Sequence, residues 1–191
     1  MAVLSGDRRG AAVIALVVLL QSGSAISAQT AAARQAPAAA ENDVKAVFLF
    51  NFAKYVTWPA VDIGERSPVE VRVCVTATDP FFALLKSAIQ GETLDGKPLT
   101  PVALDGLDEA RNCQILYVGD TQTPDAKAWL AAVRGRQVLT VGDRALNDDT
   151  VIAFVRDENR IRFDINRAAA ERRGLNISSK LLRLARQVKD R

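Results

Sequence analysis

The residue types that most often carry chemistry are sparse in this chain of 191 residues. It contains no histidine, which excludes Ser-His-Asp and Cys-His nucleophilic catalysis and histidine-based zinc sites. Its two cysteines, Cys74 and Cys113, lack the C-x-x-C spacing that is typical of redox catalysts. The sequence therefore predicts a protein that is not an enzyme and that has no metal site and no cofactor.

Three weaker patterns fit structural roles better than chemical ones. Gly91–Pro98 has the glycine and lysine spacing of a phosphate-binding loop, but it follows a predicted helix and ends in proline instead of Ser or Thr. In Ser178-Ser179-Lys180 the lysine does not lie three residues after the serine, as it does in serine–lysine hydrolases, so helix capping is favoured. The remaining carboxylates mostly fall in predicted turns and have no facing arrangement: Asp148, Asp149, Asp157, Glu158 and Asp164.

Cys74 and Cys113 each fall in a predicted buried strand. In an oxidising compartment we expect such a pair to form one structural disulfide, which would stabilise the fold by about 4 kcal/mol. The alternative is two unpaired buried thiols. The choice between them depends on where the protein resides.

The first 28 residues have the organisation of a secretory signal peptide. Arg8-Arg9 give a basic start, Ala11–Leu20 form an apolar run, and small residues up to Ala28 suit a signal peptidase. Ten apolar residues are fewer than a bilayer span needs, although an uncleaved anchor is the alternative. We therefore expect export, with cleavage near Ala28.

Charge gives little reason to expect a nucleic-acid partner. The formal net charge is +3, and removing residues 1–28 with their two arginines and one aspartate lowers it to +2. Nucleic-acid binding needs a clustered basic surface in addition to net positive charge. We therefore predict no nucleic-acid partner.

A predicted α/β domain at residues 43–191 would position the remaining candidates. Residues 29–42 are Ala-rich and predict a flexible lead-in. Val44–Pro59 is almost wholly apolar and predicts a core helix that ends at Trp58-Pro59, with a partner-binding or membrane-lying helix as the alternative. We expect its two lysines, Lys45 and Lys54, to extend outward on opposite sides of the helix.

Downstream of that helix, strand-like and helix-like segments alternate. The predicted strands are 69–76, 97–104 at an edge, 113–118, 137–141, and a hairpin of 151–155 with 161–165. The predicted helices are 81–90, 124–133, 167–173 and 179–189, the last of them basic and amphipathic. This order predicts a three-layer, Rossmann-like α/β fold with a mixed sheet of about five to six strands flanked by helices.

Several motifs together resemble the YfiR family of bacterial periplasmic proteins. They are the aromatic segment Val44–Pro59, the pair Cys74 and Cys113, the strand Arg160–Asn166 and the closing segment Gly174–Ala185. The resemblance extends from about Asp43 to Val188, and the opening and closing motifs are specific in combination.

The resemblance implies a periplasmic regulator without enzymatic activity. It would bind and repress the periplasmic sensor domain of an inner-membrane diguanylate cyclase, and an outer-membrane OmpA-like lipoprotein would release it. Cyclic di-GMP signalling and biofilm formation would follow. A homodimer and the disulfide between Cys74 and Cys113 are also implied.

Four residues are predicted to bind the partner, since exposed aromatic side chains and arginines commonly anchor interfaces: Trp58, Arg162, Asp164 and Asn166. Their alternative role is packing and ordinary surface polarity. The alternative function is a periplasmic small-molecule-binding sensor domain, with a pocket between sheet and helices. An enzyme is the third possibility.

Overall fold

The computed structural model describes residues 26–59, 69–76, 78–158 and 160–190, and their side chains from Ala40 onward. The main compact unit begins at Ala39, near the predicted start at Asp43. The predicted signal peptide lies almost entirely outside the described residues. Its cleavage and the domain boundaries at residues 28 and 42 stay predictions.

Eight strands form one mixed sheet in the order β10-β8-β7-β6-β5-β2-β4-β3. Neighbouring strands are parallel except in two antiparallel hairpins, β7–β8 and β3–β4. The strands are β2 (Val71–Thr76), β3 (Thr93–Leu94), β4 (Lys97–Leu104), β5 (Ile115–Asp120), β6 (Leu139–Asp143), β7 (Ile152–Asp157), β8 (Arg160–Asn166) and β10 (Gln187–Lys189). The open α/β sheet is confirmed, and the predicted strand number fits the six inner strands but omits the short edge strands β3 and β10.

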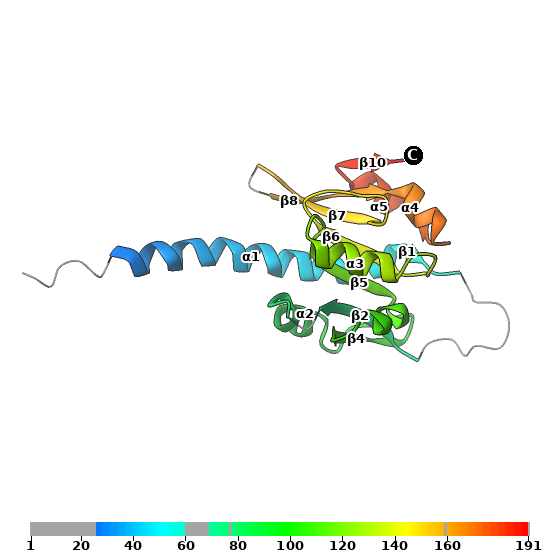
Figure 1. Cartoon of the computed structure of the whole chain (residues 1–191), viewed down its shortest axis with the longest axis horizontal. Helices are drawn as coiled ribbons and strands as arrows, with labels where there is room; N and C mark the ends of the chain where they lie inside the picture. Colours follow the sequence, from blue (N-terminus) through cyan, green and yellow to red (C-terminus); the bar gives the residue numbers. More distant parts are fainter. Residues whose placement is uncertain (1–25, 60–68, 77, 159, 191) are drawn as a thin grey trace, which may run out of the picture. The chain divides into compact units, whose positions relative to one another are not determined.

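Helices cover both faces of this sheet (Figure 1). One core cluster joins α1 (Ile26–Tyr55) and α2 (Phe81–Ile89) to residues such as Val73, Ile115 and Tyr117. A second joins η1 (Leu107–Asn112) and α3 (Pro124–Ala132) to the alternate residues, such as Cys74 and Leu116. Because successive strand side chains point to opposite faces, this alternation shows that both faces are buried. The three-layer prediction is therefore confirmed.

Helix α1 contributes large buried apolar side chains to the first cluster, as predicted for a core helix. Leu49 and Phe52 are fully buried, and the ring centroid of Phe52 lies 5.6 Å from that of Phe154 and 5.0 Å from that of Phe163. The helix differs from the prediction at both ends. It includes residues 29–42, which were predicted as a flexible lead-in, and it ends at Tyr55.

The last helical turn before Trp58 is replaced by a strand. β1 (Val56–Thr57) pairs antiparallel with β9 (Asn176–Ile177), and this small sheet lets the chain leave α1 before the proline. β9 follows α4 (Arg167–Arg172), which ends at Arg173 with the left-handed Gly174 after it. The start of the domain is thereby joined to its carboxyl-terminal part.

The predicted final helix over 179–189 is wrong in its second half. α5 (Ser179–Leu184) is capped by Ser178, whose side chain accepts a hydrogen bond from the Leu181 amide, as predicted. The helix then ends, and β10 pairs in parallel with β8, with Val188 beside Ile165. Strand pairing and the ion pair of Arg186 with Asp164 replace the expected amphipathic surface helix.

Candidate functional site

The two cysteines are joined in a disulfide between β2 and the segment that leads into β5. The Cα atoms of Cys74 and Cys113 lie 6.0 Å apart, and 39 positions separate them in the sequence. Both side chains are buried against α3. The bridge predicted from the sequence is therefore present, and it fixes the start of β5.

Trp58 is the one predicted partner-binding residue that lies at a cavity. It follows β1, and its ring is half-buried while its indole Nε1 is fully buried. Among the described residues Nε1 has no hydrogen-bond acceptor. A buried donor without an acceptor is unfavourable, so this position is suited to an acceptor from outside the chain.

The other three predicted residues share one face of β8, and the structure does not bring them together with Trp58. Asp164 is 5% exposed and forms a two-pronged ion pair with Arg186, whose Nε lies 2.9 Å from its Oδ1. Asn166 is 1% exposed, and it caps α4 by accepting from the Ala169 amide and donates to the Asn147 carbonyl. These two side chains are engaged within the fold, so Arg162, which is half-buried, is the β8 candidate left for partner contact.

A polar network lies at the carboxyl ends of the parallel strands. Lys45 on α1 is 6% exposed, and its Nζ lies 2.9 Å from both Asp143 Oδ2 and Glu41 Oε1. Tyr117 Oη donates to the same Asp143 oxygen at 2.9 Å. Lys45 therefore does not extend outward as predicted, because two carboxylates hold its charge against the sheet.

The environment of this network shifts several pKa values. Burial alone would lower the pKa of Lys45, but Glu41 and Asp143 outweigh it and raise that pKa. Burial and the neighbouring Asp143 carboxylate raise the pKa of Tyr117. Burial, followed by the charge of Asp143, raises the pKa of Asp79. The network thus holds a protonated lysine and a neutral tyrosine, which suits anchoring of α1 better than proton transfer at neutral pH.

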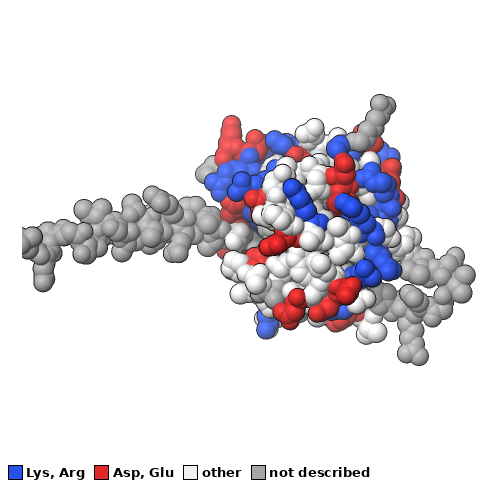
Figure 2. Space-filling view, viewed as in Figure 1, with Lys and Arg blue, Asp and Glu red and all other residues white. Residues whose placement is uncertain are grey.

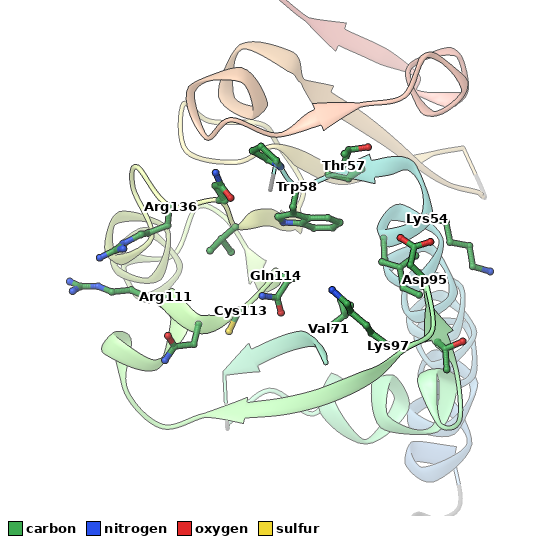
Figure 3. Close-up of a pocket in the computed structure, with 18 of the residues that line it drawn as sticks. Lys54, Thr57, Trp58, Val71, Asp95, Lys97, Arg111, Cys113, Gln114 and Arg136 are labelled. Carbon is green, nitrogen blue, oxygen red and sulfur yellow. The ribbon is translucent and has the colours of Figure 1, made fainter. Parts of the chain in front are cut away.

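A cavity of about 1130 Å³ lies at the opposite, amino ends of the strands. Its lining includes residues at the starts of four strands: Val71, Lys97, Gln114 and Val138. Figure 3 shows Trp58, Gln114 and Lys97 directed toward the middle of the cavity, whereas Lys54 is directed away from it. Lys54 instead lies 3.6 Å above the ring centroid of Phe50.

Charge in the cavity is predominantly positive. Four cations line it against one carboxylate: Lys54, Lys97, Arg111, Arg136 and Asp95. Among the described residues no carboxylate lies within ion-pair distance of Lys97 or Arg136, and Arg111 has only Asp108, at 3.7 Å. None of these residues was predicted as part of a ligand site. Gln114 lies inside the predicted strand 113–118, so no local pattern indicated that its side chain faces a cavity.

The segment Gly91–Pro98 forms part of this cavity as a tight hairpin, in agreement with its interpretation as a turn. Asp95 and Gly96 have φ values of 51° and 77°, the left-handed pair that a two-residue type I′ hairpin needs. The hairpin joins β3 to β4, where Leu94 pairs with Lys97. It therefore positions the lysine instead of binding phosphate through a helix amino terminus.

Two observations concern other kinds of site. Over the described part of the chain, no helix is both long and apolar enough to cross a bilayer, and no three metal-binding side chains gather. In the face that Figure 2 shows, basic and acidic side chains are interspersed. That face offers no continuous basic surface of the kind that nucleic acids need.

Comparison with protein families identifies one match. A family model described as YfiR/HmsC-like covers residues 42–186, which include the disulfide, the cavity lining and the network apart from Glu41. No curated protein matches the chain. The family indicates a periplasmic regulator of diguanylate cyclase signalling and is not known for enzymatic activity. The chain belongs to the YfiR/HmsC-like family.

Proposed function

We propose that this protein binds the periplasmic sensor domain of an inner-membrane diguanylate cyclase and represses the cyclase. The observation that carries the proposal is the family match over residues 42–186. The predicted signal peptide and the disulfide suit a protein that works in an oxidising, exported compartment. Repression requires the protein to bind the inactive state of the cyclase more tightly than the active state.

Trp58 and Arg162 are the proposed contact residues. Both side chains are partly exposed, and tryptophan and arginine are the residue types that most often dominate binding energy at interfaces. Asp164 and Asn166 contribute indirectly, since they hold β8 and α4 in place. Release by an outer-membrane OmpA-like lipoprotein, control of biofilm formation and a homodimer belong to the same proposal.

Deleting the gene and measuring cyclic di-GMP tests this function. We expect cyclic di-GMP to rise in the deletion strain and to return to its original level on complementation. Crosslinking in the periplasm should capture an inner-membrane cyclase with the wild-type protein and less of it with Arg162→Glu. Lys127→Glu on α3, another exposed cation, is the matched control. Unchanged cyclic di-GMP with no inner-membrane partner captured would contradict the proposal.

A second candidate function is a periplasmic small-molecule sensor. The cavity at the amino ends of the strands favours it, because ligand sites are concave and combine an apolar lining with a few polar groups. Thermal stabilisation of the purified protein by a small molecule, without any membrane partner in a pull-down, would support the sensor over the repressor.

A further inference from the structure

The interior of the cavity presents hydrogen-bond donors that lack acceptors. Gln114 Oε1 accepts from the Arg72 amide at 2.7 Å, which fixes the side-chain amide and leaves its Nε2 group as the free end. Trp58 Nε1 is buried and has no acceptor among the described residues. Lys97 is directed into the same space from β4 (Figure 3). An indole, an amide and an ammonium group therefore lie at one cavity, and among the described residues no carboxylate is hydrogen-bonded to any of the three.

Acceptor-rich anions are the ligands that such a donor set recognises. Lysine binds carboxylate and phosphate as a point charge, and indole N–H is a donor only. Among the described residues of the lining Asp95 is the one acidic residue, and it lies in the exposed hairpin turn. An oxyanion beside Gln114 and Lys97 would pair with both of these donors, and it would reach Trp58 Nε1 once a movement of the ring opened that buried atom to the cavity, whereas a neutral apolar ligand would leave them unpaired.

A second anionic group would find its own partners at one end of the cavity. Arg111 and Arg136 extend in the same direction there (Figure 3), and both are exposed. Guanidinium groups bind carboxylates and phosphates with paired N–H donors, which makes them well suited to the far end of an elongated anion. Apolar residues between the two ends, Val71 and Val138, would contact its body.

The walls of the cavity are held rigidly. The disulfide fixes Cys113, the neighbour of Gln114, against β2. The I′ hairpin fixes Lys97, and β1 pairing with β9 fixes the segment before Trp58. Preorganised donors lose little entropy when a ligand binds, so this arrangement favours binding of a small molecule.

We propose that this cavity binds a small organic anion, with one carboxylate or phosphate among Trp58, Gln114 and Lys97 and a second acidic group at Arg111 and Arg136. The proposal rests on the small-molecule candidate function and not on cyclase repression. Binding within the enclosed donor set, below the rim, distinguishes this site from a docking surface for a partner protein.

Titration of the ¹⁵N-labelled, disulfide-intact protein tests the proposal. Citrate and glycerol 2-phosphate are the probes, at constant ionic strength, and they separate carboxylate from phosphate recognition. We expect at least one of them to move the indole N–H signal of Trp58 in a saturable manner at millimolar concentrations. The signal of Trp129, on α3 and outside the cavity, is the internal reference and should stay in place.

Three variants sharpen the result. Lys97→Gln should weaken binding by about tenfold or more, because one charge-assisted contact is lost. Gln114→Glu keeps the oxygen that accepts from Arg72 but adds a carboxylate to the donor set, so it should compete with the ligand and weaken binding similarly. Lys127→Gln removes an exposed cation outside the cavity and should leave binding unchanged.

Two outcomes would overturn the proposal. One is a Trp58 signal that neither anion moves, or that moves together with Trp129. The other is loss of cyclase capture by Lys97→Gln when neither anion binds, which would make the cavity a protein-docking site. Neither outcome affects the test of repression, since that test measures cyclic di-GMP in cells without added anion.

Discussion

The two ends of the parallel strands use their polar side chains in opposite ways. At the carboxyl ends, the charges of Lys45, Glu41 and Asp143 are paired with one another and with Tyr117. At the amino ends, Trp58 and Lys97 have neither an acceptor nor an ion-pair partner among the described residues. The charges at the carboxyl end are therefore paired within the chain, although Asp143 Oδ1 is buried without a hydrogen-bond partner, whereas the cation at the amino end has no ion-pair partner among the described residues.

This difference reverses the usual arrangement of open α/β sheets. In the order β4-β2-β5-β6 the chain changes direction between β2 and β5, and such sheets normally bind ligands outside the carboxyl ends at that point. Here α1 runs along the sheet and places Lys45 beside β5 and β6 at those ends. Strand order alone would therefore indicate the carboxyl ends as the ligand site, whereas the cavity and the proposed site lie at the amino ends.

Removing the disulfide should have the largest effect on the amino end. We expect Cys74→Ser with Cys113→Ser to lower the free energy of unfolding by about 4 kcal/mol, because the bridge constrains a loop of 39 positions in the unfolded chain. Urea denaturation of the double variant measures the loss. Reduction of the wild-type protein should give the same value, and a loss below about 1 kcal/mol would show that the start of β5 is held by packing alone.

Removing Lys45, at the carboxyl ends of the strands, should have the next largest effect on the free energy of unfolding. Lys45→Met leaves Asp143 and Glu41 without their buried cation, and we expect a loss of about 3 kcal/mol in the free energy of unfolding. Lys54→Met on the same helix is the matched control and should cost less than about 0.5 kcal/mol, because Lys54 is exposed. Equal losses in the two variants would contradict the assignment of Lys45 as an anchor.

Asn166 tests whether a residue whose side chain is already hydrogen-bonded within the fold can also contact the partner protein. β8 runs antiparallel to β7, so Asn166 lies at the amino ends of the parallel strands. Asn166→Ala removes the cap of α4, and we expect a loss of about 1.5 kcal/mol in stability with unchanged partner capture per folded protein. Arg162→Ala should reduce partner capture and leave the stability unchanged. Thermal unfolding measures the stability, and periplasmic crosslinking measures the capture. If Asn166→Ala loses capture without losing stability, Asn166 is a contact residue after all.

The sequence predicted the fold well where local patterns decide the structure. Alternation identified β2, and the run before Gly119 identified β5, because a buried strand leaves a strong apolar signal. The prediction failed for the segment after Leu184, because the three-residue strand there exists only through pairing with β8. A short edge strand has too few residues to show a period, and helical charge spacing dominated the prediction instead.

The candidate site was predicted less well, for a related physical reason. Trp58 was predicted from its type and its place at the end of the aromatic segment, and Asp164 and Asn166 were predicted because they share a side of their strand with Arg162. Both side chains are buried, because Arg186, 22 positions later, pairs with Asp164, and Asn166 caps α4, which begins at the next residue. Likewise, no local pattern indicates that Lys45 meets Asp143, which lies 98 positions away.

Substituting Asp79 should have the smallest effect, and it should raise the free energy of unfolding instead of lowering it. Its side chain accepts from the Phe81 amide at 2.9 Å, but burial and the charge of Asp143 raise its pKa above the ordinary value. The folded protein therefore binds this proton more tightly than the unfolded chain, so stability falls as pH rises through the window between the two pKa values. Asp79→Asn keeps the bond to Phe81 and removes the charge, so we expect a gain below about 1 kcal/mol at pH 7. The gain should shrink as pH falls through the window and vanish below the ordinary pKa of the unfolded chain, where the wild-type side chain is protonated in both states, and thermal unfolding across that range measures it. A variant that is less stable at pH 7 would mean that the favourable effect of the Asp79 charge at the start of α2 outweighs its repulsion by Asp143. Asp79 would then be a third stabilising anion at the carboxyl end, beside Glu41 and Asp143.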